Sequence, residues 1–240
     1  MKDLTVKQET ELEAVNVESL DAWGDHDGGA QELIISKVLI MQSTSELVQA
    51  GEATMGEFRD SQSGEKYGDL KQPVSIIPFH FERVWVISSK PVGEDRYKFE
   101  GYEPINRSNE NLPWTYKENG VDMKREYTRN FYCLLPDDMS MPVIVSFKGT
   151  SAKAGKNLWT QMYLKNKNMG KIPAEFQIEL SAKRETKDKN TFCVMEIKKG
   201  KQASAEQKQQ AFEWLKTIKS TKVKVHEPEP EEFAKENVEY

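Results

Sequence analysis

The chain has 240 residues, of which 30% are charged and 37% are hydrophobic, and its formal net charge is −5. This composition is typical of a soluble protein with a modest core, and no apolar run approaches the roughly 20 residues that a membrane helix needs. The N-terminus lacks the apolar core of a signal peptide, and two cysteines and three histidines lie too far apart for a zinc site. We therefore expect a cytoplasmic protein with buried, reduced cysteines, no membrane association, no metal and no cofactor.

Charge is sorted along the chain. Residues 143–225 carry 18 Lys and Arg against 7 Asp and Glu, a net of +11, whereas residues 226–240 carry 6 acids and one Lys. The first 35 residues add 9 acids and 2 Lys. A concentrated positive surface attracts phosphate backbones, and a detached acidic peptide can shield that surface or recruit a partner.

The two ends are predicted to be disordered, because acidic, polar peptides bury too little apolar area to offset their ordering entropy. Residues 1–31 are acidic and contain Gly24, Gly28 and Gly29, and residues 226–240 are rich in Glu and contain Pro228 and Pro230. The predicted organisation is a flexible acidic arm over 1–31, a single domain over 32–225 and a disordered acidic tail over 226–240.

The first predicted ordered segment is a β-branched run over 32–42. A single helical turn, capped by the Ser43–Ser45 segment, follows and stops at Gly51. Most later segments alternate apolar and polar residues near period two, which predicts strands. Residues 103–124 are rich in Asn, Pro and Gly and predict a long loop. The predicted strands are 73–89, 96–102, 126–134, 142–147, 158–164, 174–180 and 191–197.

One helix is predicted late in the chain. Ser204 and Gln207 have the spacing of a capping box, and Ala211, Phe212, Leu215 and Ile218 continue one apolar stripe. Many short strands with one packed helix predict a mainly β fold: an antiparallel β-barrel, OB-like, with one C-terminal helix and disordered acidic termini.

Two basic and aromatic segments are candidates for binding nucleic acid. On a strand, Trp159, Gln161, Tyr163 and Lys165 would share one face, and rings beside ammonium groups suit single-stranded nucleic acid, whose bases stack while cations follow the phosphates. The alternative is that Trp159 and Tyr163 belong to the core and the lysines form a solvated rim. The candidate binding residues are Lys148, Lys153, Lys156, Trp159, Tyr163, Lys165, Lys167, Lys183, Arg184, Lys198, Lys199, Trp114 and Tyr116.

A catalytic alternative uses Glu196 and Lys198. An acid-x-Lys pair beside a second carboxylate is how many metal-dependent nucleases hold Mg²⁺ and position water. Asp188 or Glu179 would have to supply that carboxylate, and Asp188 is badly placed in a Lys-rich turn.

The segments FYCLLP, PVIVSFKGTSAKAGKNLWTQM and AEFQIELSAKRETKDKNTFCVMEIKKG, followed by a helix and an acidic end, resemble phage-encoded single-stranded DNA-binding proteins with an OB fold. The resemblance covers roughly residues 129–220 and the tail. It implies sequence-tolerant binding of single-stranded DNA (ssDNA) in a barrel groove, protection of strands in replication or recombination, and location in the cytoplasm of an infected bacterium. The tail resembles those of bacterial ssDNA-binding proteins, which recruit replication enzymes, but it ends in Asn-Val-Glu-Tyr instead of Asp-rich sequence with Pro-Phe.

The sequence thus predicts a non-enzymatic ssDNA-binding protein with no catalytic residues, whose tail shields the groove or recruits replication or recombination proteins. Self-association into a homo-oligomer is compatible with the sequence. The alternatives are the nuclease and a virion or scaffold component whose basic patch meets an acidic protein.

Overall fold

The computed structural model describes residues 32–93, 97–165 and 173–225, and the predicted arm and tail lie outside these residues. Within the described residues, no helix is long and apolar enough to span a bilayer. The strands are β1 (Glu32–Ile35), β2 (Lys37–Ile40), β3 (Phe58–Asp60), β4 (Lys66–Gly68), β5 (Val74–Lys90), β6 (Lys98–Pro104), β7 (Thr115–Glu118), β8 (Val121–Leu135), β9 (Asp138–Phe147), β10 (Phe176–Lys187), β11 (Asn190–Gln202) and β12 (Lys222–Val225). The helical elements are α1 (Glu46–Gln49), η2 (Gly149–Ser151), α2 (Ala152–Trp159), η3 (Thr160–Lys165), η4 (Pro173–Glu175) and α4 (Ala205–Ser220).

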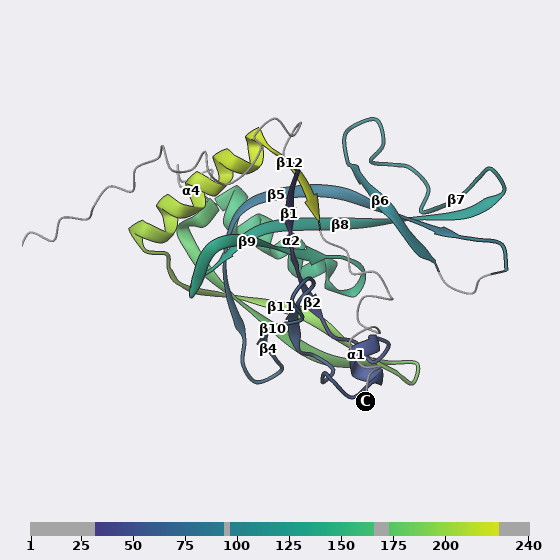
Figure 1. The fold of residues 1–240 in the computed structure, drawn as a ribbon, viewed down its shortest axis with the longest axis horizontal. Helices are drawn as coiled ribbons and strands as arrows, with labels where there is room; N and C mark the ends of the chain where they lie inside the picture. Colours follow the sequence, from purple (N-terminus) through teal and green to yellow (C-terminus); the bar gives the residue numbers. More distant parts are fainter. Residues whose placement is uncertain (1–31, 94–96, 166–172, 226–240) are drawn as a thin grey trace, which may run out of the picture. The chain divides into compact units, whose positions relative to one another are not determined.

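One strongly curled sheet dominates the fold (Figure 1). Its strand order is β11-β10-β5-β8-β9-β2-β3-β4, with β6 added to β5 and β7 added to β8. Most neighbouring pairs are antiparallel, while β2 with β9 and the separate pair of β1 with β12 are parallel. The prediction of a mainly β, OB-like antiparallel β-barrel with one C-terminal helix is confirmed, and the barrel takes the form of a strongly curled half-barrel sheet.

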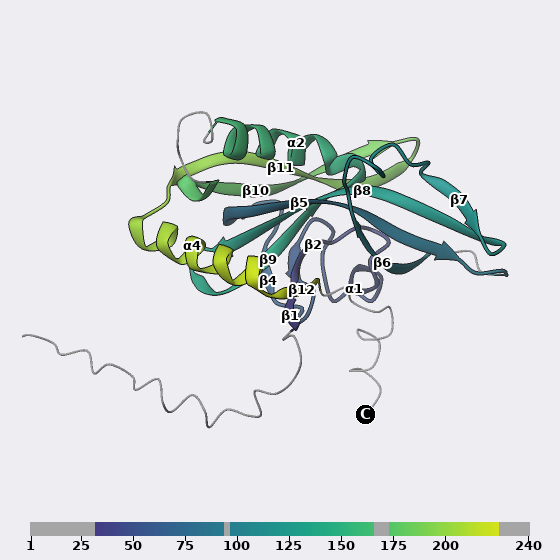
Figure 2. The same cartoon turned by 90° about the horizontal axis from the view of Figure 1, so that it is seen from above.

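The central strands bury side chains on both faces, because α2 covers one face and α4 covers the other (Figure 2). Successive strand residues point to opposite faces, so neighbours in sequence enter different clusters. Ile76 packs with Leu158 of α2, whereas Ile77 packs with Ala211 and Ile218 of α4. The apolar runs of β5, β8 and β9 are therefore continuous instead of alternating.

Helix α4 forms as predicted. The Ser204 side chain accepts a hydrogen bond from the Gln207 backbone N–H, and the Gln207 side chain accepts one from the Ser204 backbone N–H. These two bonds satisfy donors that the first turn of a helix leaves free. The buried residues Ala211 and Ile218 lie on the predicted apolar stripe, whereas Phe212, which was predicted on the same stripe, is 47% exposed.

The strand predicted over 158–164 is wrong. Residues 152–165 form α2, which continues as the π-helix η3. The buried positions Gly155, Leu158 and Met162 recur at steps of three and four, which is a helical period. The predicted loop over 103–124 also contains an unpredicted strand, β7, which pairs with β8.

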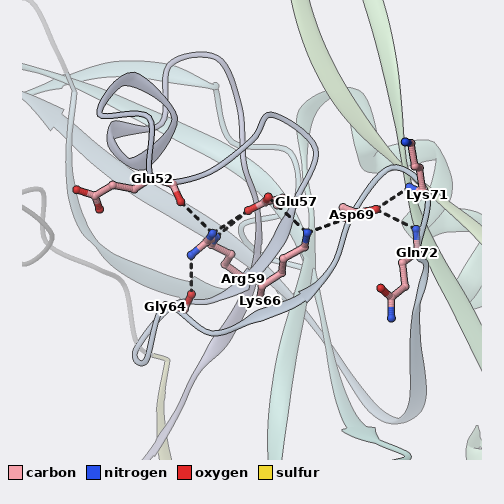
Figure 3. A network of polar contacts seen from close by, with 8 residues as sticks. All are labelled: Glu52, Glu57, Arg59, Gly64, Lys66, Asp69, Lys71 and Gln72. Carbon is pink, nitrogen blue, oxygen red and sulfur yellow. Dashed lines mark hydrogen bonds and ion pairs between the residues drawn. The ribbon is translucent and has the colours of Figure 1, made fainter.

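A polar network holds the β3–β4 hairpin (Figure 3). Arg59 donates from Nε to Glu57 at 2.9 Å, and Lys66 lies 2.8 Å from Asp69 and 3.5 Å from Glu57. Burial by itself raises the pKa of the Glu57 carboxyl, but the hydrogen bonds from Arg59 and from the Thr54 backbone, together with the nearby charges of Arg59 and Lys66, outweigh burial and lower this pKa. The Glu57 carbonyl accepts a hydrogen bond from Met41 at 2.8 Å, so the hairpin fixes the chain where β2 ends.

Candidate nucleic-acid interface

The exposed edge of β11 is held by side chains from two places, the segment that follows β2 and the short helix η2. Gln42 imitates a neighbouring strand: its Nε2 donates to the Cys193 carbonyl at 2.9 Å, and its Oε1 accepts from the Cys193 N–H at 2.8 Å. Ser43 donates to the Thr191 carbonyl at 3.3 Å, and Ser151 accepts from the Met195 N–H at 3.0 Å. Gln42 and Ser43 thereby join β11 to a segment about 150 residues away in the sequence.

Two adjoining pockets follow this edge, and we call them together the β11-edge groove. The first has a volume of about 650 Å³ and is lined by Gln42, Ser43, Thr44, Thr150 and residues 189–193. The second has a volume of about 460 Å³ and is lined by Thr150, Lys153, Ala154, Asn157, Lys183, Glu185 and residues 194–197. Because Thr150 belongs to both, the pockets form a path between the β10–β11 turn and α2.

Several predicted binding lysines are already paired with carboxylates. Lys148 lies 3.5 Å from Glu126, and Lys198 lies 3.4 Å from Glu179. Lys183 lies 3.3 Å from Glu185 and 3.6 Å from Glu196, and these carboxylates raise the pKa of its ammonium group. These cations are locally neutralised and supply little free positive field.

Other cations face solvent without an acidic partner. On α2, Lys153 and Lys156 are exposed, and neither forms an ion pair with another residue of the described ranges. Lys199 lies 3.4 Å from the centre of the Phe176 ring, a cation–π contact that leaves its charge unneutralised. Arg184 lies beside the Cys193 thiol, whose pKa burial raises. We expect these unpaired cations to contribute most to phosphate binding.

The aromatic candidates fall into two groups. Trp159 and Tyr163 are four residues apart on α2 and η3, and both pack on the core, with ring centroids 6.4 and 5.6 Å from that of Phe81. Burial raises the pKa of the Tyr163 hydroxyl. The predicted strand face that combined these rings with Gln161 and Lys165 therefore does not exist.

The second aromatic group lies on an extension of the sheet formed by β6, β7 and the adjoining ends of β5 and β8, which we call the β6–β7 extension. This extension lies away from α2 in both views (Figures 1 and 2). Trp114 is 62% exposed, and the Arg125 guanidinium lies 3.8 Å from the centre of the Tyr116 ring. The structure thus separates these two residues from the β11-edge groove. The Lys165 side chain and the whole of Lys167 lie outside what the structure describes.

The residues of the nuclease alternative lie in cross-strand ion pairs. Glu196 contacts Lys183, Lys198 contacts Glu179, and Asp188 lies in the β10–β11 turn. Within residues 32–93, 97–165 and 173–225, no group of three or more His, Cys, Asp or Glu is placed to hold a metal ion.

Sequence reasoning missed the polar half of the groove. Gln42, Ser43, Thr44 and Thr150 carry no basic or aromatic signal, and only the fold brings them to β11. The helical turn predicted after the Ser43–Ser45 segment is present as α1, with Ser45 at its N-cap position, but the Ser45 hydroxyl accepts from the Gln42 N–H and forms no capping bond to the helix. The second role of this segment, against an edge strand, has no local signature.

The fold and this groove define a mainly β, OB-like protein with a basic, hydroxyl-rich strand edge. The family model for the Pam3 phage gp34-like protein matches residues 6–224. The chain belongs to this phage protein family, which agrees with the phage part of the predicted resemblance. No match was found among curated proteins or among solved structures.

Proposed function

We propose that this phage protein binds ssDNA without sequence preference and protects it during replication or recombination. The observation that carries the proposal is the β11-edge groove, which has exposed lysines without an acidic partner at both ends, Lys189 and Lys153. Between them lie hydroxyl and amide groups, including those of Thr150 and Asn190, and the ion pairs that Lys183 forms with Glu185 and Glu196. Lysines bind phosphates as point charges, and hydroxyl and amide groups donate hydrogen bonds to phosphate oxygens.

The half-barrel supports the same proposal. OB folds bind single strands along a groove with cations that follow the backbone and rings on which bases stack. Because Trp159 and Tyr163 pack on the core, the exposed Trp114 of the β6–β7 extension is the better candidate for stacking on a base. The backbone would then follow the β11-edge groove.

We expect oligo(dT) to bind with strong salt dependence, each phosphate contact contributing about −0.7 to the log–log salt slope. Fluorescence anisotropy with labelled ssDNA, duplex DNA and RNA at several salt concentrations measures this. Replacing both unpaired α2 lysines, Lys153→Gln with Lys156→Gln, should reduce the magnitude of the slope by about 1.4. Lys216→Gln on α4 is the matched control, because this lysine is already paired with Glu213 at 3.3 Å. Duplex binding as tight as ssDNA binding would contradict the groove proposal, and no binding to any nucleic acid would favour a virion or scaffold role.

The acidic tail, residues 226–240, is proposed to shield the same groove. Six glutamates tethered near the basic surface have a high effective concentration there and should compete with phosphates. Truncation after Val225 should therefore tighten oligo(dT) binding at low salt, and the gain should shrink as ionic strength rises. Equal affinities of the full and truncated chains at low salt would refute shielding and leave recruitment of a partner as the role to test.

A further inference from the structure

Two hairpins of this protein use the same kind of two-residue turn with different residues. Between β7 and β8, Asn119 and Gly120 have φ values of +50° and +81°; between β10 and β11, Asp188 and Lys189 have φ values of +48° and +69°. Positive φ at both central residues defines a turn for which Asn-Gly is strongly preferred. The first hairpin follows this preference, and the second places a lysine where glycine is expected.

The left-handed conformation disfavours lysine because its Cβ approaches the following carbonyl oxygen, whereas glycine avoids this contact. Asp188 is compatible with the conformation, since Asp and Asn tolerate it better than other side chains. Lys189 is therefore the strained residue of the turn. Nothing in its packing compensates, because its side chain is exposed and pairs with no acid among the described residues.

The strained Lys189 lies at a pocket on the surface of the protein. Lys189 lines the larger pocket of the β11-edge groove together with Thr44, Thr150 and Asn190. These three side chains are exposed, and none of them is hydrogen-bonded to another residue of the described ranges. Gln42 and Cys193 also line this pocket, and the pair of hydrogen bonds between them joins its two sides. An ammonium group, two hydroxyls and an amide thus surround one concave site, each with a hydrogen-bond donor to offer.

We propose that this end of the groove is a phosphate-binding subsite for the nucleic-acid backbone, and that Lys189 occupies the left-handed position because its charge is needed there. The inference rests on the proposed ssDNA function and deepens it. The subsite would contact the backbone of the nucleic acid and not its bases, because most of its groups are hydrogen-bond donors. Phe192 is the one aromatic residue that lines this pocket, and it is half-buried.

The test uses three substitutions at one position in the full chain. Lys189→Gly removes the charge and the strain, Lys189→Asn removes the charge but suits the turn, and Lys189→Arg keeps both charge and strain. We expect Lys189→Gly to raise the melting temperature by about 2–4 °C. Lys189→Gly and Lys189→Asn should both weaken oligo(dT) binding about two- to fivefold and reduce the salt slope by about 0.7. Lys189→Arg should bind like the wild type, and Lys216→Gln is again the control for lost charge.

Affinity and salt slope unchanged in Lys189→Gly and Lys189→Asn would overturn the subsite, even if the melting temperature rises. A second probe separates the subsite from the proposed function. If the wild type does not bind oligo(dT), ssDNA binding is refuted, and tripolyphosphate still tests the subsite. Thermal stabilisation by tripolyphosphate that is lost in Lys189→Gly would support a phosphate site for another polyphosphate. Equal stabilisation of both proteins, or stabilisation of neither, would overturn the subsite.

Discussion

Gly155→Val should lower the free energy of unfolding by about 3 kcal/mol, at the upper end of the range for an overpacked interior. A Cβ at this position would lie 2.5 Å from the Phe147 Cβ and 2.9 Å from its Cγ. Phe147 is fully buried on β9, and its Cβ is fixed to the backbone, so neither side can yield without moving α2. Glycine is required here by close packing of a helix on a sheet.

Urea denaturation compares this variant with Lys156→Val, the same new residue at the next, exposed position of α2. The control should lose less than about 1 kcal/mol, because only helix propensity changes. The displaced helix of Gly155→Val should also weaken oligo(dT) binding, since α2 carries Lys153 and Lys156. Similar midpoints for the two variants would show that α2 does not pack on Phe147 as described.

Trp159→Ala should lower the free energy of unfolding by about 3 kcal/mol while leaving the salt slope of ssDNA binding unchanged. Its indole packs on the core beside Phe81, so truncation leaves a gap that the surrounding rings cannot fill. Trp114→Ala is the matched comparison, because Trp114 is 62% exposed and its loss should change stability by less than about 0.5 kcal/mol.

The two tryptophans should therefore give opposite results. If Trp114 stacks on a base, its truncation should weaken oligo(dT) binding by about 1–3 kcal/mol. Stability retained in Trp159→Ala together with a loss of affinity of that size would restore Trp159 as the stacking residue. Paired urea and anisotropy curves on both variants decide between these roles.

The strand content of the fold was predictable because β-strand patterns are local. The run predicted over 73–89 matches β5 (Val74–Lys90) to within one residue at each end, and the run over 126–134 falls within β8. The capping box at Ser204 begins α4 as its spacing indicates. Local signals failed at α2, where Trp159, Gln161 and Tyr163 suggested a strand face. The aromatic residues at alternate positions favoured a strand, whereas the helical spacing of Gly155, Leu158 and Met162 is recognisable only when the buried face is known.

The sequence by itself determined that the chain is mainly β, from its alternating segments, and that residues 143–225 are basic while both ends are acidic, from its charges. Only the tertiary structure decided which cations are available to bind phosphate, because ion pairing depends on strand register. Glu179 lies opposite Lys198 in the β10–β11 hairpin and pairs with it. The α2 lysines, by contrast, pair with no acid in the described ranges. It also decided that Gln42 lies against Cys193, a contact made by the curl of the sheet between residues 151 positions apart. A site built across such a distance leaves no spacing in the sequence, since each half is shaped by its own local structure and the two halves meet only when the sheet closes.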